Sequence, residues 1–205
     1  MEKKKVIGLT GTYCAGKNFV ASLLKERGLS VLDVDKLGHK VIEDEKKQLI
    51  ARFGRDILAD DGHIDRKLLG KKVFGKPDEL AALEEIIHPA VNRETLSWIN
   101  DKNERSCVIN AALLHRSSVF EKLDAVIIVE APLLIRLLRA KKRDKLPWSA
   151  LINRFKSQIK FHSQYFNRKT DIYRVENSGF PCLKKQSRLE TQIDEIFSLL
   201  GLNRV

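Results

Sequence analysis

Several features that define common protein classes are missing from this chain of 205 residues. Its three cysteines are far apart, with no Cys-x-x-Cys or paired Cys/His spacing, which argues against a disulfide framework and against a zinc site. No apolar run approaches the ~20 residues that a membrane-spanning helix needs. Gly8, Thr10 and Gly11 interrupt the apolar segment that a signal peptide would require after the basic amino terminus. We therefore expect a cytoplasmic protein that does not enter a membrane.

Acidic residues are in the minority. Lys and Arg number 38 against 27 Asp and Glu, so the formal net charge is +11. Such a charge suits either a polyanion or a polyphosphate substrate. Between residues 136 and 160, nine Lys or Arg residues accompany a single acid, Asp144. Aromatic residues are not interleaved with this run in a base-stacking pattern, so we expect no nucleic-acid partner. A solvated helix face is the alternative explanation for most of these charges.

The most informative motif lies near the amino terminus. Residues 11–18 read Gly-Thr-Tyr-Cys-Ala-Gly-Lys-Asn, which is the G-x-x-x-x-G-K phosphate loop with Asn18 in place of the expected Ser or Thr. Its glycines let successive backbone N–H groups turn into one concavity, and the start of the next helix favours phosphate. A strand at 5–10 and a helix at 19–27 provide the context that the motif requires. The alternative is a Gly-Lys turn with no ligand. The predicted nucleotide-binding residues are Gly11, Cys14, Ala15, Gly16, Lys17, Asn18 and Phe19.

Two residues within this loop are chemically distinctive. Lys17 is expected to reach the β- and γ-phosphates of a bound nucleotide. Cys14 lies beside this cation and beside a helix start, both of which stabilise a thiolate, so we expect an acidified thiol. We interpret it as a spectator thiol and not as a catalytic one.

Strand and helix signals alternate along the chain. The apolar run at 124–130 is typical of a strand buried on both faces of a parallel sheet. The alternation predicts an α/β fold, with a P-loop NTPase-type parallel sheet of about five strands and helices on both faces. Ligands of such sheets bind at the carboxyl ends of the strands. The predicted strands are 5–10, 30–35, 106–111, 124–130 and 171–175, and the principal helices are 19–27, 36–53, 77–102, 132–143, 147–166 and 188–200.

Asp33 and Asp35 end the second predicted strand. Strand alternation puts both on one face, at the edge of the sheet where the phosphate loop ends. Two carboxylates there are suited to holding Mg²⁺ and to accepting the proton of an attacking hydroxyl. The amide oxygen of Asn18 is a further candidate Mg²⁺ ligand. The alternatives are that the acids cap the following helix and that Asn18 caps the helix after the loop. The spacing leaves the division of roles between Asp33 and Asp35 open.

Arginines late in the chain are candidates for charge stabilisation. Arg139 and Arg143 are four residues apart and so share one helix face. Arginine binds phosphate oxygens with two donors, and a mobile lid that carries it excludes water during phosphoryl transfer. Arg154, one helix further on, and His88, beside Pro89, are candidate substrate contacts. Surface charge for the arginines, and a structural role for His88 at a helix junction, are the alternatives.

Together, these residues resemble those of a known family, the dephospho-CoA kinases. The resemblance runs in order through nearly the whole chain, and the His-Pro junction with the Asp-x-Asp and Arg-x-x-x-Arg placements is its most specific part. The residues that carry it include Gly8-Leu-Thr-Gly11, Gly16-Lys17, Val31-Leu-Asp-Val-Asp35, Ile87-His88-Pro89, Arg139, Arg143-Asp144, Arg154, Gln158 and Asn177-Ser-Gly179.

The resemblance implies a single P-loop kinase domain over residues 1–205, with a helical substrate-binding region at about 54–103 and a lid at about 139–160. It implies transfer of the ATP γ-phosphoryl group, with Mg²⁺, to the ribose 3′-hydroxyl of dephospho-CoA in coenzyme A biosynthesis. Asp35 would be the base, Arg139 and Arg143 the lid arginines, and Asn177 a residue near the adenine.

The chain also departs from the family pattern. Thr12, Cys14, Ala15 and Asn18 stand where Gly or Ser is common, and Asn110-Ala-Ala112 stands where a proline often precedes the Leu-Leu pair. These departures bear on catalytic rate and metal dependence more than on the fold. Acceptor specificity is spread over several helices, so the sequence leaves other functions open. The alternatives are another small-molecule or nucleotide P-loop kinase, and a degenerate, non-catalytic nucleotide-binding protein.

Overall fold

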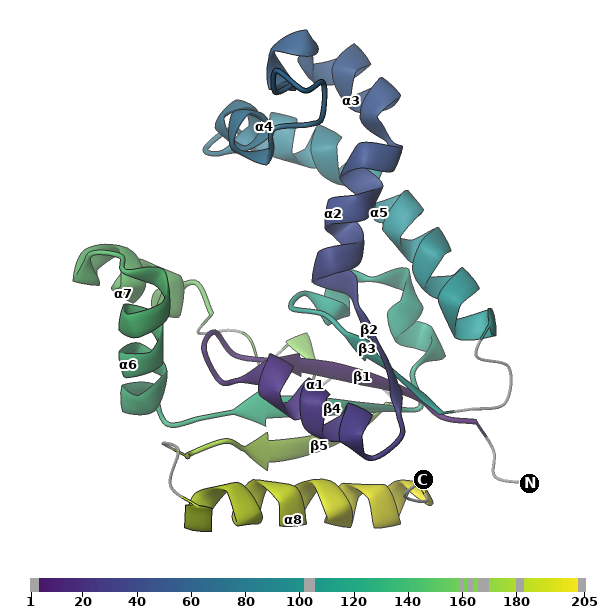
Figure 1. Cartoon of the computed structure of the whole chain (residues 1–205), viewed down its shortest axis with the longest axis vertical. Coiled ribbons are helices and arrows are strands. Elements are labelled where there is room, and N and C mark those ends of the chain that lie inside the picture. The colour runs from purple at the N-terminus through teal and green to yellow at the C-terminus, as the bar shows by residue number, and fades with distance from the viewer. Residues whose placement is uncertain are drawn as a thin grey trace. The chain divides into compact units, whose positions relative to one another are not determined.

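A five-stranded sheet forms the centre of the fold. We describe a computed structural model of the chain, for residues 4–101, 106–158, 161, 164–165, 170–179 and 183–202, without the side chains of 183–187. The strands lie in the order β2-β3-β1-β4-β5 (Figure 1). Strand β1 pairs in parallel with β3 and β4, and β4 pairs in parallel with β5. The predicted α/β fold and its five strands are therefore confirmed. The strands are β1 (Val6–Gly11), β2 (Ser30–Asp33), β3 (Cys107–Asn110), β4 (Ala125–Glu130) and β5 (Asp171–Glu176).

The central strands are apolar because both of their faces are covered. Residues 6–10, 107–110 and 125–129 are all buried, whereas the edge strands β2 and β5 are more exposed. Leu9 pairs with Asn110 and Gly11 pairs with Val129, so β1, β3 and β4 end at the same edge of the sheet. The phosphate-loop sequence follows β1 at this edge.

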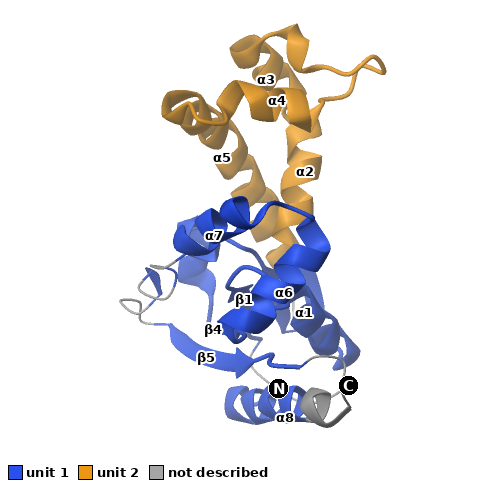
Figure 2. Ribbon diagram, turned by 90° about the vertical axis from the view of Figure 1, so that its left-hand side faces the viewer, with its two compact units in different colours: residues 1–32, 101–205 blue, residues 33–100 orange. Residues whose placement is uncertain are grey.

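Two compact units make up the chain (Figure 2). The first comprises residues 1–32 and 101–205, with helices α1 (Lys17–Glu26), α6 (Leu133–Asp144), α7 (Trp148–Lys156) and α8 (Leu183–Leu200). Helices α1 and α8 share one apolar core with one face of the sheet. On the opposite face Tyr165 packs against Phe120 of the short helix η3 (Ser118–Lys122), and its hydroxyl donates to Thr10 Oγ1 at 3.5 Å. The first unit also contains the short helix η2 (Leu114–Arg116).

The second unit, residues 33–100, is helical and has a core of its own. It contains α2 (Val34–Asp44), α3 (Lys46–Phe53), η1 (Arg55–Ile57), α4 (Arg66–Val73) and most of α5 (Pro77–Asp101). Leu49, Phe53, Ile57 and Leu69 are among its buried residues. The Asp65 carboxylate caps α4 by accepting from the N–H groups of Lys67 and Leu68. The unit begins at residue 33, ahead of the helical region expected at about 54–103.

Several element boundaries differ from prediction. Strand β2 ends at Asp33, because the Asp33 carboxylate accepts the Lys36 N–H at 3.1 Å and caps α2. The strand predicted to reach residue 35 is therefore wrong at its end, and Asp35 lies in the first helical turn. The helix predicted at 36–53 is two helices that meet at Glu45. Pro89 lies inside the continuous helix α5, not at a junction between two helices.

Later in the chain, the predicted helix at 147–166 is too long, since α7 ends at Lys156. Helix α8 begins at Leu183, earlier than predicted. Within the described ranges, no helix combines the length and apolarity that crossing a membrane requires.

Candidate active site

The loop between β1 and α1 exposes a set of backbone donors. Gly16 caps α1, and the Ala15 N–H closes the loop by donating to Thr12 O at 3.0 Å. Among the residues that the structure describes, no hydrogen bond uses the N–H groups of Cys14, Gly16 or Asn18. These donors lie at the amino-terminal end of α1, where the helix dipole adds positive potential. The arrangement is suited to binding an anion such as phosphate.

Gly16 is required by both its backbone angle and its neighbour. Its φ is 96°, in the left-handed region, and a Cβ there would collide with the Asn177 amide nitrogen. Asn177 is 7% exposed and donates from that nitrogen to Ala15 O at 2.8 Å. Asn177, which is predicted to contact the nucleotide, therefore stabilises the phosphate loop by binding its backbone. Gly11 lies so close to β4 that a Cβ would approach Val129 O to 2.7 Å.

Cys14 differs from its predicted chemistry. Burial raises the pKa of its thiol above the usual value, and the guanidinium of Arg143 opposes this effect only in part. The expected acidification is therefore wrong, because the loss of hydration outweighs the nearby positive charges. Cys14 also has a φ of 60°, which is uncommon for a residue with a side chain. The raised pKa supports the interpretation of Cys14 as a spectator thiol, without a catalytic role.

Arg139 of α6 binds the outside of the loop. Its guanidinium donates to Ala15 O at 3.1 Å, to Asn177 O at 3.2 Å and to Gly179 O at 2.6 Å. It also contacts Cys14 O at 3.5 Å. Arg139 thus joins the phosphate loop to the segment that follows β5.

Arg143 and Arg154 meet at one carboxylate. Arg143 binds Asp144 with two donors, Nε to Oδ1 at 2.7 Å and Nη2 to Oδ2 at 3.2 Å. Arg154 Nη1 donates to the same Oδ2 at 3.2 Å. Hydrogen bonds from Arg143 and from the Tyr13 hydroxyl lower the pKa of Asp144 to about 2. Both predicted arginines therefore lie beside the loop, and α6 and α7 stand next to it in the first unit (Figure 1).

Sequence reasoning missed the roles of two residues that bind the loop backbone, Arg136 of α6 and Gln158, which follows the end of α7. Arg136 Nε donates to Tyr13 O at 2.8 Å, and Gln158 Oε1 accepts the Tyr13 N–H at 2.6 Å. A signal existed for Arg136, which precedes Arg139 by three residues and Arg143 by seven, and so lies on the same helix face. No sequence pattern pointed from Gln158 or Tyr13 to this contact.

Asn18 pairs with a residue of the neighbouring strand. Its Oδ1 accepts from Asn110 Nδ2 at 3.2 Å, and Asn110 is 2% exposed. Asn18 is not the helix cap, since Gly16 holds that position. The buried Oδ1 of Asn110 has no hydrogen-bond partner in the described part of the chain. Two amide oxygens thus lie beside the phosphate loop, and both are acceptable ligands for a hard cation.

No acidic cluster accompanies these amides. Over the described ranges, no group of three or more His, Cys, Asp or Glu residues is placed to hold a metal ion. The amide oxygens of Asn18 and Asn110 therefore offer Mg²⁺ neutral ligands only, and they would contribute little to its binding affinity.

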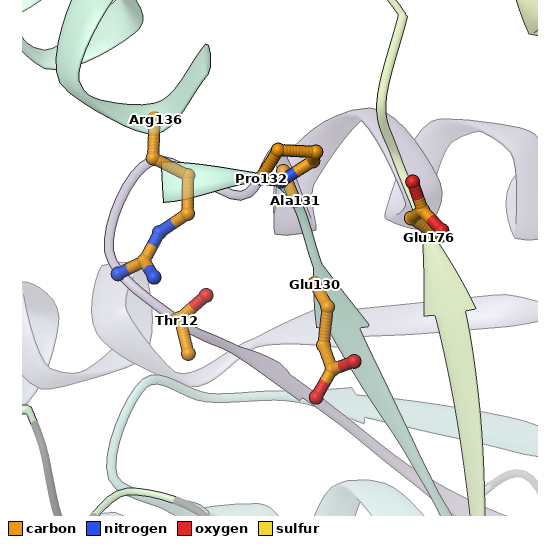
Figure 3. A pocket seen from close by; sticks show the side chains of 6 residues that line it. All are labelled: Thr12, Glu130, Ala131, Pro132, Arg136 and Glu176. Atoms are coloured by element: carbon orange, nitrogen blue, oxygen red, sulfur yellow. The ribbon is translucent and has the colours of Figure 1, made fainter. Parts of the chain in front are cut away.

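A pocket of about 390 Å³ opens at the ends of β4 and β5. Figure 3 shows Arg136 reaching toward Thr12, while Glu130 and Glu176 come from the two strand ends. The Thr12 hydroxyl is buried without a hydrogen-bond partner among the described residues. Two carboxylates against one guanidinium make this pocket unfavourable for phosphate. Phosphate groups are expected instead at the N–H groups of Cys14, Gly16 and Asn18.

Three of the predicted residues belong to the second unit. Asp33 is the cap of α2, and Asp35 is exposed in the first turn of that helix. His88 is half-buried in α5, next to Pro89. In the first unit, Lys17 is the first residue of α1, and Phe19, in the same turn, is 42% exposed.

Known proteins are similar to this chain in sequence and in fold. The family model described as dephospho-CoA kinase matches residues 5–179. A dephospho-CoA kinase of Treponema denticola is 33% identical over 90% of this chain and 87% of its own length. One of Shouchella clausii is 35% identical over 84% of this chain and 89% of its own.

Among solved structures, TT1252 from Thermus thermophilus has a TM-score of 0.79 and 27% identity, covering 97% of this chain and 99% of its own. The family match, the curated relatives and the parallel sheet with its phosphate loop agree. The chain therefore belongs to the dephospho-CoA kinase family, whose members are ATP-dependent kinases of coenzyme A biosynthesis.

Proposed function

We propose that this chain works in the cytoplasm, where it transfers the γ-phosphoryl group of ATP to the ribose 3′-hydroxyl of dephospho-CoA. The observation that supports this most is the set of N–H groups of Cys14, Gly16 and Asn18 at the positive end of α1, which no hydrogen bond among the described residues uses. Backbone donors in this arrangement bind phosphate chains without needing a particular side chain. In this proposal, the unusual side chains of the loop therefore do not prevent nucleotide binding.

The nucleotide is held by the loop and by the segment after β5. Lys17 binds the β- and γ-phosphates. Its partners in the nucleotide site are Gly11, Cys14, Ala15, Gly16, Asn18 and Phe19, with Asn177 near the adenine. In this proposal the lid, residues of about 139–160, closes over the phosphates.

Arg139 and Arg143 stabilise the negative charge that spreads over the transferring group. Arg143 is 60% exposed at its side chain, which leaves it accessible to a phosphate oxygen. Such arginines are worth roughly 10³–10⁵ in rate in phosphoryl transfer. Arg154 contacts the substrate in this proposal.

The acceptor binds through the second unit. Asp35 is the base that orients the ribose hydroxyl and takes its proton, and His88 contacts the same substrate. Asp35 is exposed at the start of α2, whereas the Asp33 carboxylate accepts the Lys36 N–H and caps that helix. This separation supports Asp35, and not Asp33, as the base.

Mg²⁺ accompanies the nucleotide in this proposal. When bound, it neutralises charge on the β- and γ-phosphates. Asn18 and Asp33 are the residues that would hold it, with the neutral amide of Asn110 beside Asn18. Because Asn18 is neutral, we expect the phosphates to provide most of the affinity for the ion.

A direct test measures ADP and 3′-phosphorylated product from ATP, Mg²⁺ and dephospho-CoA. Asp35→Asn is expected to lower kcat by roughly 10²–10⁴-fold with ATP binding retained, the range typical of a lost general base. Asp44→Asn is the matched control, since Asp44 is exposed in the last turn of the same helix. Normal turnover by Asp35→Asn would contradict the assigned base, and absence of turnover in the parent would contradict the function.

A further inference from the structure

Tyr13 lies in the phosphate loop, but its side chain packs into the helices α6 and α7. Its ring and that of Phe155 meet edge to face, at a centroid distance of 5.3 Å and an interplanar angle of 72°. The guanidinium carbons of Arg143 and Arg154 lie 5.1 Å and 5.7 Å from the ring centroid. Both arginines are thus held against the electron-rich face of one aromatic ring.

The hydroxyl of Tyr13 adds a polar contact to Arg154 and, through Asp144, to Arg143. It donates to Asp144 Oδ2, the oxygen that also accepts from Arg143 and Arg154. Arg154 Nη1 in turn donates to the Tyr13 hydroxyl at 3.2 Å. Three donors therefore converge on one carboxylate oxygen, and the Asp144 side chain is only 15% exposed.

The direction of the ring is set by the backbone of Tyr13. Its N–H is taken by Gln158 and its carbonyl by Arg136, which also packs over the Phe155 ring at 4.8 Å. With both backbone groups engaged, Tyr13 cannot turn without breaking its contacts to α6 and to Gln158, which follows the end of α7. Its N–H is also not available to a phosphate, unlike those of Cys14 and Gly16.

We propose that Tyr13 is a positioning residue for phosphoryl transfer, because its ring and hydroxyl together fix the guanidinium groups of Arg143 and Arg154 beside the phosphate loop. The inference rests on the proposed function, which assigns these arginines to the transferring group and the substrate. Tyr13 acts through them and touches neither reactant. Misplacement of a catalytic group by about 1 Å can cost roughly 10²-fold in rate.

Two substitutions separate the contributions of Tyr13. Tyr13→Leu keeps apolar bulk but removes the ring face and the hydroxyl, and is expected to lower kcat about 10²-fold. Tyr13→Phe keeps the ring against both arginines and Phe155, and is expected to lose only about tenfold. KM for ATP is expected to change less than about threefold in both, because the N–H groups that bind phosphate stay in place.

Tyr173→Leu is the matched control. Tyr173 is a half-buried residue of β5 that packs against the apolar core of the first unit, outside the phosphate loop and the lid. The same ring and hydroxyl are removed there, away from both arginines, so a kcat within about threefold of the parent is expected. Thermal unfolding of all variants shows whether a lower kcat accompanies a folded protein.

The outcomes distinguish this inference from the proposed function. If Arg143→Ala lowers kcat strongly while Tyr13→Leu stays within about threefold of the parent, the positioning role is wrong and the function stands. If Tyr13→Phe loses as much as Tyr13→Leu, the role of the ring is wrong. If Arg143→Ala itself leaves kcat unchanged, the assignment of the arginine in the proposed function fails.

Discussion

Gly16→Ala is expected to destabilise the protein and to weaken ATP binding. The added Cβ meets the Asn177 amide nitrogen, and Asn177 cannot move away without giving up its 2.8 Å bond to Ala15 O. A left-handed backbone with a side chain costs about 1–2 kcal/mol. Disrupting a buried hydrogen bond costs a further ~1–3 kcal/mol. The free energy of unfolding is therefore expected to fall by about 2–5 kcal/mol.

Thermal and denaturant unfolding measure this loss. In a chain of this length each 1 kcal/mol lowers Tm by about 2–4 °C, so Tm is expected to fall by about 4–20 °C. Gly38→Ala is the control, because Gly38 lies inside α2 and an added Cβ has no neighbour within 4 Å. This change is expected to stabilise the protein by about 0.5–1 kcal/mol, as Gly→Ala does in a helix.

A double-mutant cycle identifies the collision itself. With Asn177→Ala already present, Gly16→Ala no longer meets a side-chain amide, so its cost is expected to fall to about the backbone term of 1–2 kcal/mol. Additive losses in the double variant, or a loss below about 1 kcal/mol for Gly16→Ala alone, would refute the reasoning.

Three further predictions concern the loop and the helices beside it. Asn18→Ser is expected to retain or raise the initial rate at low Mg²⁺, since a hydroxyl replaces a neutral amide as the ligand; a large drop in a Mg²⁺ titration would show another role for Asn18. Asp144 has a pKa lowered to about 2, so the stability that it provides is fully present above about pH 4 and is lost as pH falls toward 2. The free energies of unfolding of the parent and of Asp144→Asn are therefore expected to converge over this range. A difference that does not change with pH would argue against the ion pairs. Because the pKa of Cys14 is raised, alkylation of its thiol is expected to be slow at pH 7 and to accelerate only in alkaline solution. The alkylation measured in Cys14→Ser is subtracted from that of the parent, and a rapid remaining reaction at pH 7 would contradict the prediction.

Local patterns were sufficient for the phosphate loop and for most of the sheet. The spacing of Gly11, Gly16 and Lys17 specifies a turn that leads from a strand into a helix, and the structure confirms it. The apolar run at 124–130 predicted a buried parallel strand because both faces of that strand must be covered. Such features depend on neighbours in sequence, so the sequence is enough.

Predictions failed where two local effects compete. Asp33-Val-Asp35 fits an alternating strand, but the Asp33 carboxylate binds the Lys36 N–H and starts the helix two residues earlier. At Cys14, the nearby charges were visible in the sequence while the burial that outweighs them was not. In both cases the deciding quantity is a contact or a buried surface, which spacing does not give.

Contacts between distant segments could not be predicted at all. Asn18 and Asn110 are separated by 92 residues, and Tyr13 and Gln158 by 145. Each pair joins the phosphate loop to another element through a single hydrogen bond. A single sequence carries no periodic signal for such a pair, so Tyr13 could be recognised only after the loop and the two helices were placed.

The most direct test of the central claim is a crystal structure of the protein with Mg²⁺ and a non-hydrolysable ATP analogue. The phosphates are expected to lie within hydrogen-bonding distance of the backbone N–H groups of Cys14, Gly16 and Asn18, with Lys17 at the β- and γ-phosphates. Phosphates bound elsewhere, with these N–H groups left unused, would contradict it.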